Sequence, residues 1–134
     1  MEHKIGNMQK TIFISGAILG GLAVAIGAYG AHGGAKYMDA ESMITFGKAV
    51  RYQMHHALVL LAVALAYSQL PDQKKILNIA GMSLIGGIVL FSGSLYLIVF
   101  AKLNMGYVTP LGGILFIIGW FSLAYAAYKH KFSD

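Results

Sequence analysis

The sequence predicts an all-α integral membrane protein, a four-helix bundle with a short amphipathic interfacial helix before the second span. The 134 residues are 57% hydrophobic and only 11% charged, with a mean hydropathy of +0.67, whereas a soluble domain carries about 25% charged residues. The uncharged residues gather in four runs, which are residues 11–31, 52–70, 76–101 and 108–128. Each run is close to or above the ~20 residues that a helix needs to cross the hydrocarbon. We therefore expect one membrane domain, residues 1–134.

The first predicted span, residues 11–31, follows a basic N-terminal segment, as the core of a signal peptide does. Its apolar run exceeds the roughly 7–15 residues of such a core, and three further spans follow it. We therefore expect a true span. The sequence His32-Gly33-Gly34 marks its end, since glycine commonly terminates a helix in a left-handed conformation.

Residues 40–51 form the predicted interfacial helix. Asp39 precedes them and is a good N-cap. Apolar residues then recur every three or four positions, while Lys48, Arg51 and His55 recur on a different face. The segment either lies at the membrane surface or continues directly into the second span.

The basic residues predict how the spans are oriented. With four spans, both termini and the turn at 71–75 share one side, which carries six lysines against four basic residues on the other side. The positive-inside rule then places both termini in the cytoplasm. Tyr67, Tyr125 and Tyr128 lie near the terminal-side ends of their spans, as expected of an interfacial aromatic belt.

A glycine pattern recurs in three of the four spans. A glycine pair, five residues and a further glycine occupy positions 20–27, 86–93 and 112–119. Glycines seven residues apart share one helix face and let neighbouring backbones approach closely. We expect a helix-packing role for the nine glycines concerned, which are Gly20, Gly21, Gly27, Gly86, Gly87, Gly93, Gly112, Gly113 and Gly119. An internal duplication is the alternative explanation.

Polar residues of all four spans fall on the side of residues 32–51, because the direction of the spans alternates. The candidate ligand-binding residues are His32, Arg51, Tyr52, His56, Ser92, Ser94 and Tyr96. No Asp or Glu lies inside a span, so Arg51 must reach lipid headgroups, helix-end carbonyls or an anionic ligand. We expect the histidines to be hydrogen-bonded packing residues that fix how the first and second spans dock. A proton-sensitive switch and metal or haem ligation are the alternatives.

The sequence offers no recognisable catalytic set. It has no cysteine, and the serines of Ser92-Gly93-Ser94 lack an acid partner for a triad. No HxxxH pair supports a metal site, and no basic face on a soluble module supports nucleic-acid binding. We expect no catalytic residue, no metal, no cofactor and no nucleic-acid partner. Trp120 lies near mid-span, where we expect it to pack rather than to anchor at the interface.

Four blocks of the sequence together resemble a known family. They are GAYGAHGG at 27–34, AVRYQMHHAL at 49–58, LFSGSLYL at 90–97 and TPLGGILFIIGW at 109–120. They are similar to the signature blocks of domain of unknown function 423, a small bacterial membrane family with mitochondrial relatives similar to the transmembrane-256 protein. The resemblance implies a four-span protein of the bacterial inner membrane and brings no activity or catalytic residue. In the family pattern RYQxxH, the matching histidine is His56 rather than His55.

The function expected from these features is non-enzymatic. We expect a compact bundle that packs through its glycine-rich faces against itself, as a homo-oligomer, or against a larger membrane complex, in contact with membrane lipids. The alternative is a binding or transport protein that holds an anionic lipid headgroup or a small solute at Arg51 and His56. A third class is an enzyme, or a haem or quinone protein, that uses His32 and His56.

Overall fold

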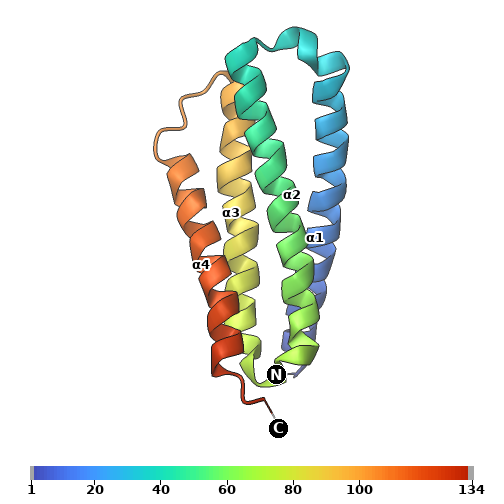
Figure 1. Cartoon of the computed structure of the whole chain (residues 1–134), viewed down its shortest axis with the longest axis vertical. Helices are drawn as coiled ribbons and strands as arrows, with labels where there is room; N and C mark the ends of the chain where they lie inside the picture. The colour runs from blue at the N-terminus through green and yellow to red at the C-terminus, as the bar shows by residue number, and fades with distance from the viewer. Residues whose placement is uncertain (1, 133–134) are drawn as a thin grey trace.

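Four long helices joined by short connections make up the computed structural model (Figure 1). The structure describes residues 2–132, with side chains from residue 8 onward. The elements are α1 (Glu2–Ala31), η1 (Gly33–Tyr37), α2 (Ala40–Gln69), η2 (Pro71–Gln73), α3 (Lys74–Ala101) and α4 (Val108–Lys129). Each of the long helices contains a stretch apolar enough to cross a membrane. The predicted all-α architecture of four membrane helices is confirmed.

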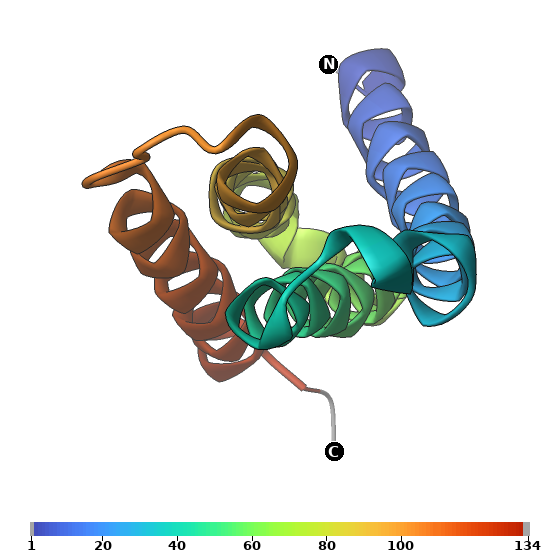
Figure 2. The same cartoon turned by 90° about the horizontal axis from the view of Figure 1, so that it is seen from above.

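The helices follow one another in chain order, as the view from above shows (Figure 2). α1 packs mainly on α2, and α4 packs mainly on α3. α2 and α3 also pack on each other, while α1 makes few contacts with α3. In the apolar windows of α1 and α4, 17% and 22% of the residues are buried, against 39% in α2 and α3. The first and last helices therefore present the broadest outward faces.

The connections lie at two opposite ends of the bundle (Figure 1). η2 lies at the same end as the start of α1 and the end of α4, which we call the terminal end. η1 and the 102–107 loop lie at the other end, which we call the loop end. At the terminal end, Asp72 of η2 pairs with His130, which follows α4. This contact ties the end of α4 to the turn between α2 and α3.

Helix α2 begins at the predicted cap. The side chain of Asp39 accepts a hydrogen bond from the backbone N–H of Ser42 at 2.8 Å, and this bond lowers the pKa of the Asp39 carboxyl. The helix then runs unbroken to Gln69, so the interfacial segment 40–51 and the second span form one helix. At ~1.5 Å per residue α2 is about 45 Å long, which exceeds the ~30 Å of hydrocarbon and gives one helix room for both the interfacial segment and the span.

Helix α1 ends at the predicted place but by a different geometry. η1 follows Ala31 almost directly, and neither Gly33 nor Gly34 adopts a left-handed conformation. Gly34 is needed for space instead, because a Cβ there would lie 2.5 Å from the ring of Tyr29. The prediction of a left-handed glycine terminus is therefore wrong for α1. The left-handed helix end belongs to α3, where Lys102 has a φ of 56°.

The hydrophobic core lies between α2 and α3 and takes in one face of α1 and of α4. Its largest fully buried apolar side chains are Ile12, Leu60, Val63, Leu77 and Leu84. Because lipid tails are as apolar as the core, the hydrophobic effect does not drive the helices together inside the membrane. The buried side chains stabilise the bundle through van der Waals contacts instead.

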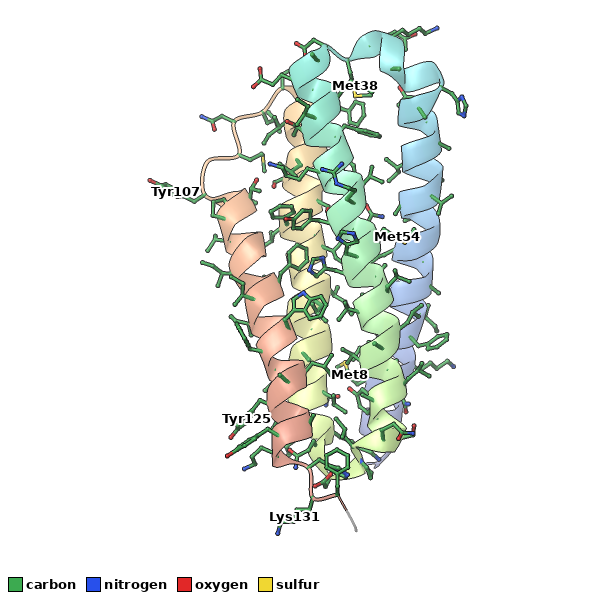
Figure 3. All side chains as sticks on the ribbon, viewed as in Figure 1. Met8, Met38, Met54, Tyr107, Tyr125 and Lys131 are labelled. Atoms are coloured by element: carbon green, nitrogen blue, oxygen red, sulfur yellow. The ribbon has the colours of Figure 1, made fainter. Side chains whose placement is uncertain are left out.

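The three tyrosines predicted to form an aromatic belt do not behave alike. Tyr67 is only 2% exposed, and its hydroxyl donates a hydrogen bond to Oδ1 of Asn78 on α3. The belt prediction is wrong for Tyr67, which joins α2 to α3 inside the bundle. Tyr125 and Tyr128 are exposed, and Tyr125 projects outward from α4 (Figure 3).

Within the glycine repeat, the closest contacts lie between α3 and α4. A Cβ on Gly112 would overlap the backbone N and Cα atoms of Phe91, and one on Gly87 would lie 2.5 Å from the ring of Phe116. On Gly119 a Cβ would lie 2.6 Å from Leu84. At these positions only glycine lets the two helices approach to their present distance.

The remaining glycines of the repeat have more room. A Cβ on Gly86 would lie 3.2 Å from Leu115, on Gly27 3.4 Å from Val50, and on Gly20 3.7 Å from Ala57. Positions with no atom within 4 Å of such a Cβ are Gly21, Gly93 and Gly113. Close contacts also occur outside the repeat, at Gly16 against Ala57, Gly30 against Phe46 and Gly81 against Ile12.

Candidate functional site

Gln53 is the centre of the polar contacts between helices. Its side chain is 3% exposed and lies on α2. Nε2 donates to the backbone oxygen of Leu19 on α1 at 2.8 Å, and Oε1 accepts from the hydroxyl of Tyr96 on α3 at 2.7 Å. One amide thus connects three helices. Gln53 is absent from the predicted site residues, and the signal that could have found it is an amide at the second position of a largely apolar span.

His56 is held through both of its ring nitrogens. Nδ1 lies 2.7 Å from the backbone oxygen of Tyr52, and Nε2 lies 3.1 Å from Nε1 of Trp120 on α4. Because the indole N–H can only donate, Nε2 must accept, which leaves the proton on Nδ1 and the ring neutral. The ring also stacks on Phe116, with centroids 3.6 Å apart. No ring nitrogen is left for a metal or a substrate.

We predicted that the histidines fix how the first and second spans dock, and for His56 this prediction is wrong. Its side-chain contacts join α2 to α4, not to α1. The first and second spans dock instead through two glutamines: Gln53, and Gln9 on α1, whose Nε2 donates to the backbone oxygen of Ala64 at 2.9 Å. His32 lies exposed at the end of α1, apart from this network.

Ser92 and Ser94 are buried on α3 and are bonded within the bundle. The hydroxyl of Ser92 donates to the backbone oxygen of Ala49 on α2 at 2.7 Å. The hydroxyl of Ser94 donates to the backbone oxygen of Phe91 at 2.9 Å and meets the hydroxyl of Thr109 on α4. Among the side chains that the structure describes, every buried polar atom has a hydrogen-bond partner. The serines thus act as links between helices, as hydroxyls commonly do in membrane bundles.

Arg51 lies exposed at the edge of this network. Its guanidinium folds back along α2, and Nη1 lies 3.1 Å from the position that a Cβ on Gly47 would occupy. Within residues 8–132 the one ion pair is Asp72–His130, so no described carboxylate lies within 4 Å of Arg51. The guanidinium therefore faces its surroundings with its donors available.

A groove of about 720 Å³ runs between α2 and α4. The residues that line it are Tyr52, His55, His56, Leu58, Phe91, Gly113, Phe116, Ile117 and Trp120. Its walls are almost entirely aromatic and aliphatic. Of the predicted site residues, the structure thus brings Tyr52 and His56 to the groove, and it places Ser92, Ser94 and Tyr96 in the hydrogen bonds that hold the helices together.

No group of three His, Asp or Glu side chains in the described part of the chain is placed to hold a metal ion. Of the two exposed histidines of the loop-end half, His32 follows the end of α1 and His55 lies on α2.

The profile of the family described as "protein of unknown function (DUF423)" matches residues 26–113. The chain belongs to the DUF423 family. A UPF0382 membrane protein of Haemophilus influenzae is 43% identical over 116 residues, which cover 86% of this chain and 91% of the relative. The UPF0382 membrane protein YwdK of Bacillus subtilis is 40% identical over 123 residues, which cover 91% of this chain and 99% of the relative. No solved structure matches the chain.

The DUF423 match includes most of the polar contacts between helices. It contains Gln53, His56, Ser92 and Ser94, and it ends before Trp120. The relatives are named membrane proteins, in agreement with the four spans of the fold. This DUF423 protein is thus a four-span membrane protein whose buried polar groups join its helices.

Proposed function

We propose that this protein is a non-enzymatic packing component of the bacterial cell membrane, which associates with itself or with a larger membrane complex. The observation that carries the proposal is a contrast between the inside and the outside of the bundle. Inside, Gln53, His56, Ser92 and Ser94 have their polar atoms engaged by neighbouring helices. Outside, small residues on α1 lie open.

The hydrogen bonds of the buried polar side chains argue against a catalytic role for them. A catalytic acid, base or nucleophile must reach the substrate within hydrogen-bond distance. The two nitrogens of His56 and the hydroxyls of Ser92 and Ser94 already form hydrogen bonds within the bundle, some within one helix and some between helices. Their arrangement is that of structural polar groups in a membrane bundle.

One outward face of α1 carries exposed small residues. Ala17, Gly21 and Ala25 are exposed and recur every four residues. A Cβ on Gly21 would meet no atom within 4 Å. Small residues at this spacing let a second helix approach closely, and such close packing drives helix association in membranes. α1 is also the helix with the smallest buried share.

Cysteine cross-linking in native membranes tests the association. The chain has no cysteine, so Gly21→Cys introduces a single thiol on the proposed face, and Leu22→Cys provides a matched control at the same depth but about 100° around the helix. We expect oxidant-dependent cross-linking of Gly21→Cys, to a dimer of this chain or to a larger protein, and little of Leu22→Cys. Equal cross-linking of both variants, or of neither, would contradict the proposal.

We further infer that the terminal end of the bundle faces the cytoplasm. The support is the excess of lysines at that end, six against four basic residues at the loop end; the side chain of one of the six, Lys4, lies outside the described residues. Asn104→Cys at the loop end should react with a membrane-impermeant maleimide on intact spheroplasts. Gln73→Cys at the terminal end should react only after permeabilisation. The reverse pattern would overturn the orientation.

A further inference from the structure

The loop-end half of α2 carries a basic strip that continues into the α2–α4 groove. Lys48, Arg51 and His55 follow one another at intervals of three and four residues and are all exposed. At this spacing they share one helix face. His55 itself lines the groove, together with Tyr52, the residue next to Arg51. Arg51 and Lys48 therefore lie about one and two turns from His55 toward the loop end, beyond the residues that line the groove.

The guanidinium of Arg51 lies against Gly47 on the surface of α2. Nη1 lies 3.1 Å from the position that a Cβ on Gly47 would take, so the absence of a side chain at Gly47 leaves the space that the guanidinium uses. Gly47 lies one turn nearer the loop end than Arg51. The side chain thus directs its charge toward the membrane surface while its aliphatic part stays along the helix, as arginine does near the ends of membrane spans.

The charge of this strip is not neutralised within the described chain. The carboxylates nearest in sequence are Asp39 and Glu41, at the start of α2; Asp39 caps the helix, and neither forms an ion pair with Lys48 or Arg51. An anion from outside the chain is the natural counterpart. The fork of donors on a guanidinium suits a phosphate group, which can accept two parallel hydrogen bonds.

The groove next to the basic strip suits a hydrocarbon chain attached to such a phosphate group. Its volume of about 720 Å³ lies within the range of roughly 300–1,000 Å³ that is usual for small-molecule sites. Phe91, Ile117 and the other walls offer apolar surface for hydrocarbon. His56, in the same wall, has both nitrogens occupied and adds no free polar group. A soluble anion would gain nothing from this surface, whereas an acyl chain would.

We propose that this face of the bundle binds one anionic glycerophospholipid, with its phosphate at Arg51 and Lys48 and one acyl chain in the groove between α2 and α4. Charge complementarity at the head of the groove selects the anionic headgroup. The site goes beyond the packing role proposed above, because it uses a different face of the molecule from the α1 strip.

The groove contains its own reporter, since Trp120 is the one tryptophan of the chain and lies in the groove wall. The purified protein would be reconstituted in phosphatidylcholine vesicles that contain a tenth of either phosphatidylglycerol or phosphatidylcholine with brominated acyl chains. Bromine quenches indole fluorescence on contact. We expect the brominated phosphatidylglycerol to occupy the groove about fivefold more readily than the brominated phosphatidylcholine for each basic residue engaged.

Two variants distinguish specific lipid binding at Arg51 from nonspecific attraction between the basic protein and anionic lipid. Arg51→Gln should remove most of the preference for phosphatidylglycerol, while Lys75→Gln, which changes an exposed lysine at the terminal end, should retain it. Circular dichroism would verify that each variant keeps its helices. If Arg51→Gln does not fold, Lys48→Gln asks the same question, because the side chain of Lys48 is exposed.

Two results would overturn the proposal. One is equal quenching by the two brominated lipids in the unaltered protein, which means that no anionic lipid is selected. The other is an unchanged preference in folded Arg51→Gln or Lys48→Gln, which means that the selection comes from elsewhere. Neither result bears on cross-linking through α1, so the two proposals can fail separately.

Discussion

Trp120 donates its indole N–H to Nε2 of His56 across 3.1 Å, and this bond connects α4 directly to α2. The same histidine donates through Nδ1 to the backbone of its own helix and stacks on Phe116. A single neutral ring therefore joins α2 to α4, although α4 packs mainly on α3. The relationship has consequences for stability that can be measured.

Replacing His56 with Ala should loosen the contact between α2 and α4. The change removes a buried ring, leaves a cavity beside Phe116 and leaves the indole N–H of Trp120 without its acceptor. We expect the free energy of unfolding in detergent to fall by about 2–3 kcal/mol. His55→Ala is the matched control, because the neighbouring imidazole is exposed, and should change stability by less than about 0.5 kcal/mol.

The fluorescence of Trp120 identifies which helix is released. Its emission and anisotropy should change in His56→Ala, since the indole loses its hydrogen bond and its neighbour. An unchanged Trp120 signal together with lost stability would mean that His56 supports another pair of helices.

The adjacent glycines 112 and 113 should respond in opposite ways to the same methyl group. A Cβ on Gly112 would overlap the backbone of Phe91, whereas one on Gly113 meets no atom within 4 Å. Because backbone atoms cannot give way, Gly112→Ala should force α3 and α4 apart and cost about 1–3 kcal/mol or more. Gly113→Ala should be neutral or stabilise the helix by up to ~1 kcal/mol. Unfolding in graded mixtures of mild detergent and dodecyl sulfate would measure both, and similar losses in both variants would contradict the account.

The bond between Gln53 and Tyr96 can be measured by a double-mutant cycle. Gln53→Leu removes the links to α1 and α3, and Tyr96→Phe removes only the hydroxyl that donates to Oε1 of Gln53. We expect both variants to be less stable, Gln53→Leu by more, with a coupling energy of about 0.6–1.7 kcal/mol. Additive losses would show that the hydroxyl and the amide do not stabilise each other.

The first turn of α2 should loosen in acid. The pKa of Asp39 lies below its ordinary value of 3.8, because its carboxylate accepts the backbone N–H of Ser42. The stabilisation is therefore fully present above that ordinary value and is lost as the pH falls through the lowered pKa. Hydrogen exchange at Ser42 and its neighbours should accelerate in acid relative to the intrinsic rates. In Asp39→Asn, which keeps an acceptor but no charge, this extra pH dependence should disappear.

Much of the architecture follows from the sequence because it depends on local properties of the chain. The lengths of the uncharged runs determine that there are four spans, since each segment must satisfy its backbone within a helix. The cap at Asp39 is local as well, and it lies where the sequence predicts it. The end of α1 is predicted at the correct residue but with the wrong geometry, because Gly34 serves to make room for Tyr29, a contact outside the glycine pattern.

The faces on which the helices meet were decided only by the tertiary structure. Membrane helices are apolar on all sides, so the period of the sequence does not show which side is buried. Glycine spacing alone therefore could not separate Gly112, at a backbone contact, from Gly21, in open space. For the same reason Tyr67 is predicted at the interface and lies in the core.

The polar residues illustrate the same division. The sequence by itself determined that His56 and the serines lie in the loop-end half of the membrane, because the alternating direction of the spans requires it. It could not determine their partners, since His56 could reach any of the other three helices from its place in the chain. The packing of the helices turns this face of α2 toward Trp120 on α4 and turns Gln53 toward α1 and α3. Position along the membrane is thus a property of the sequence, whereas rotation about the helix axis results from packing.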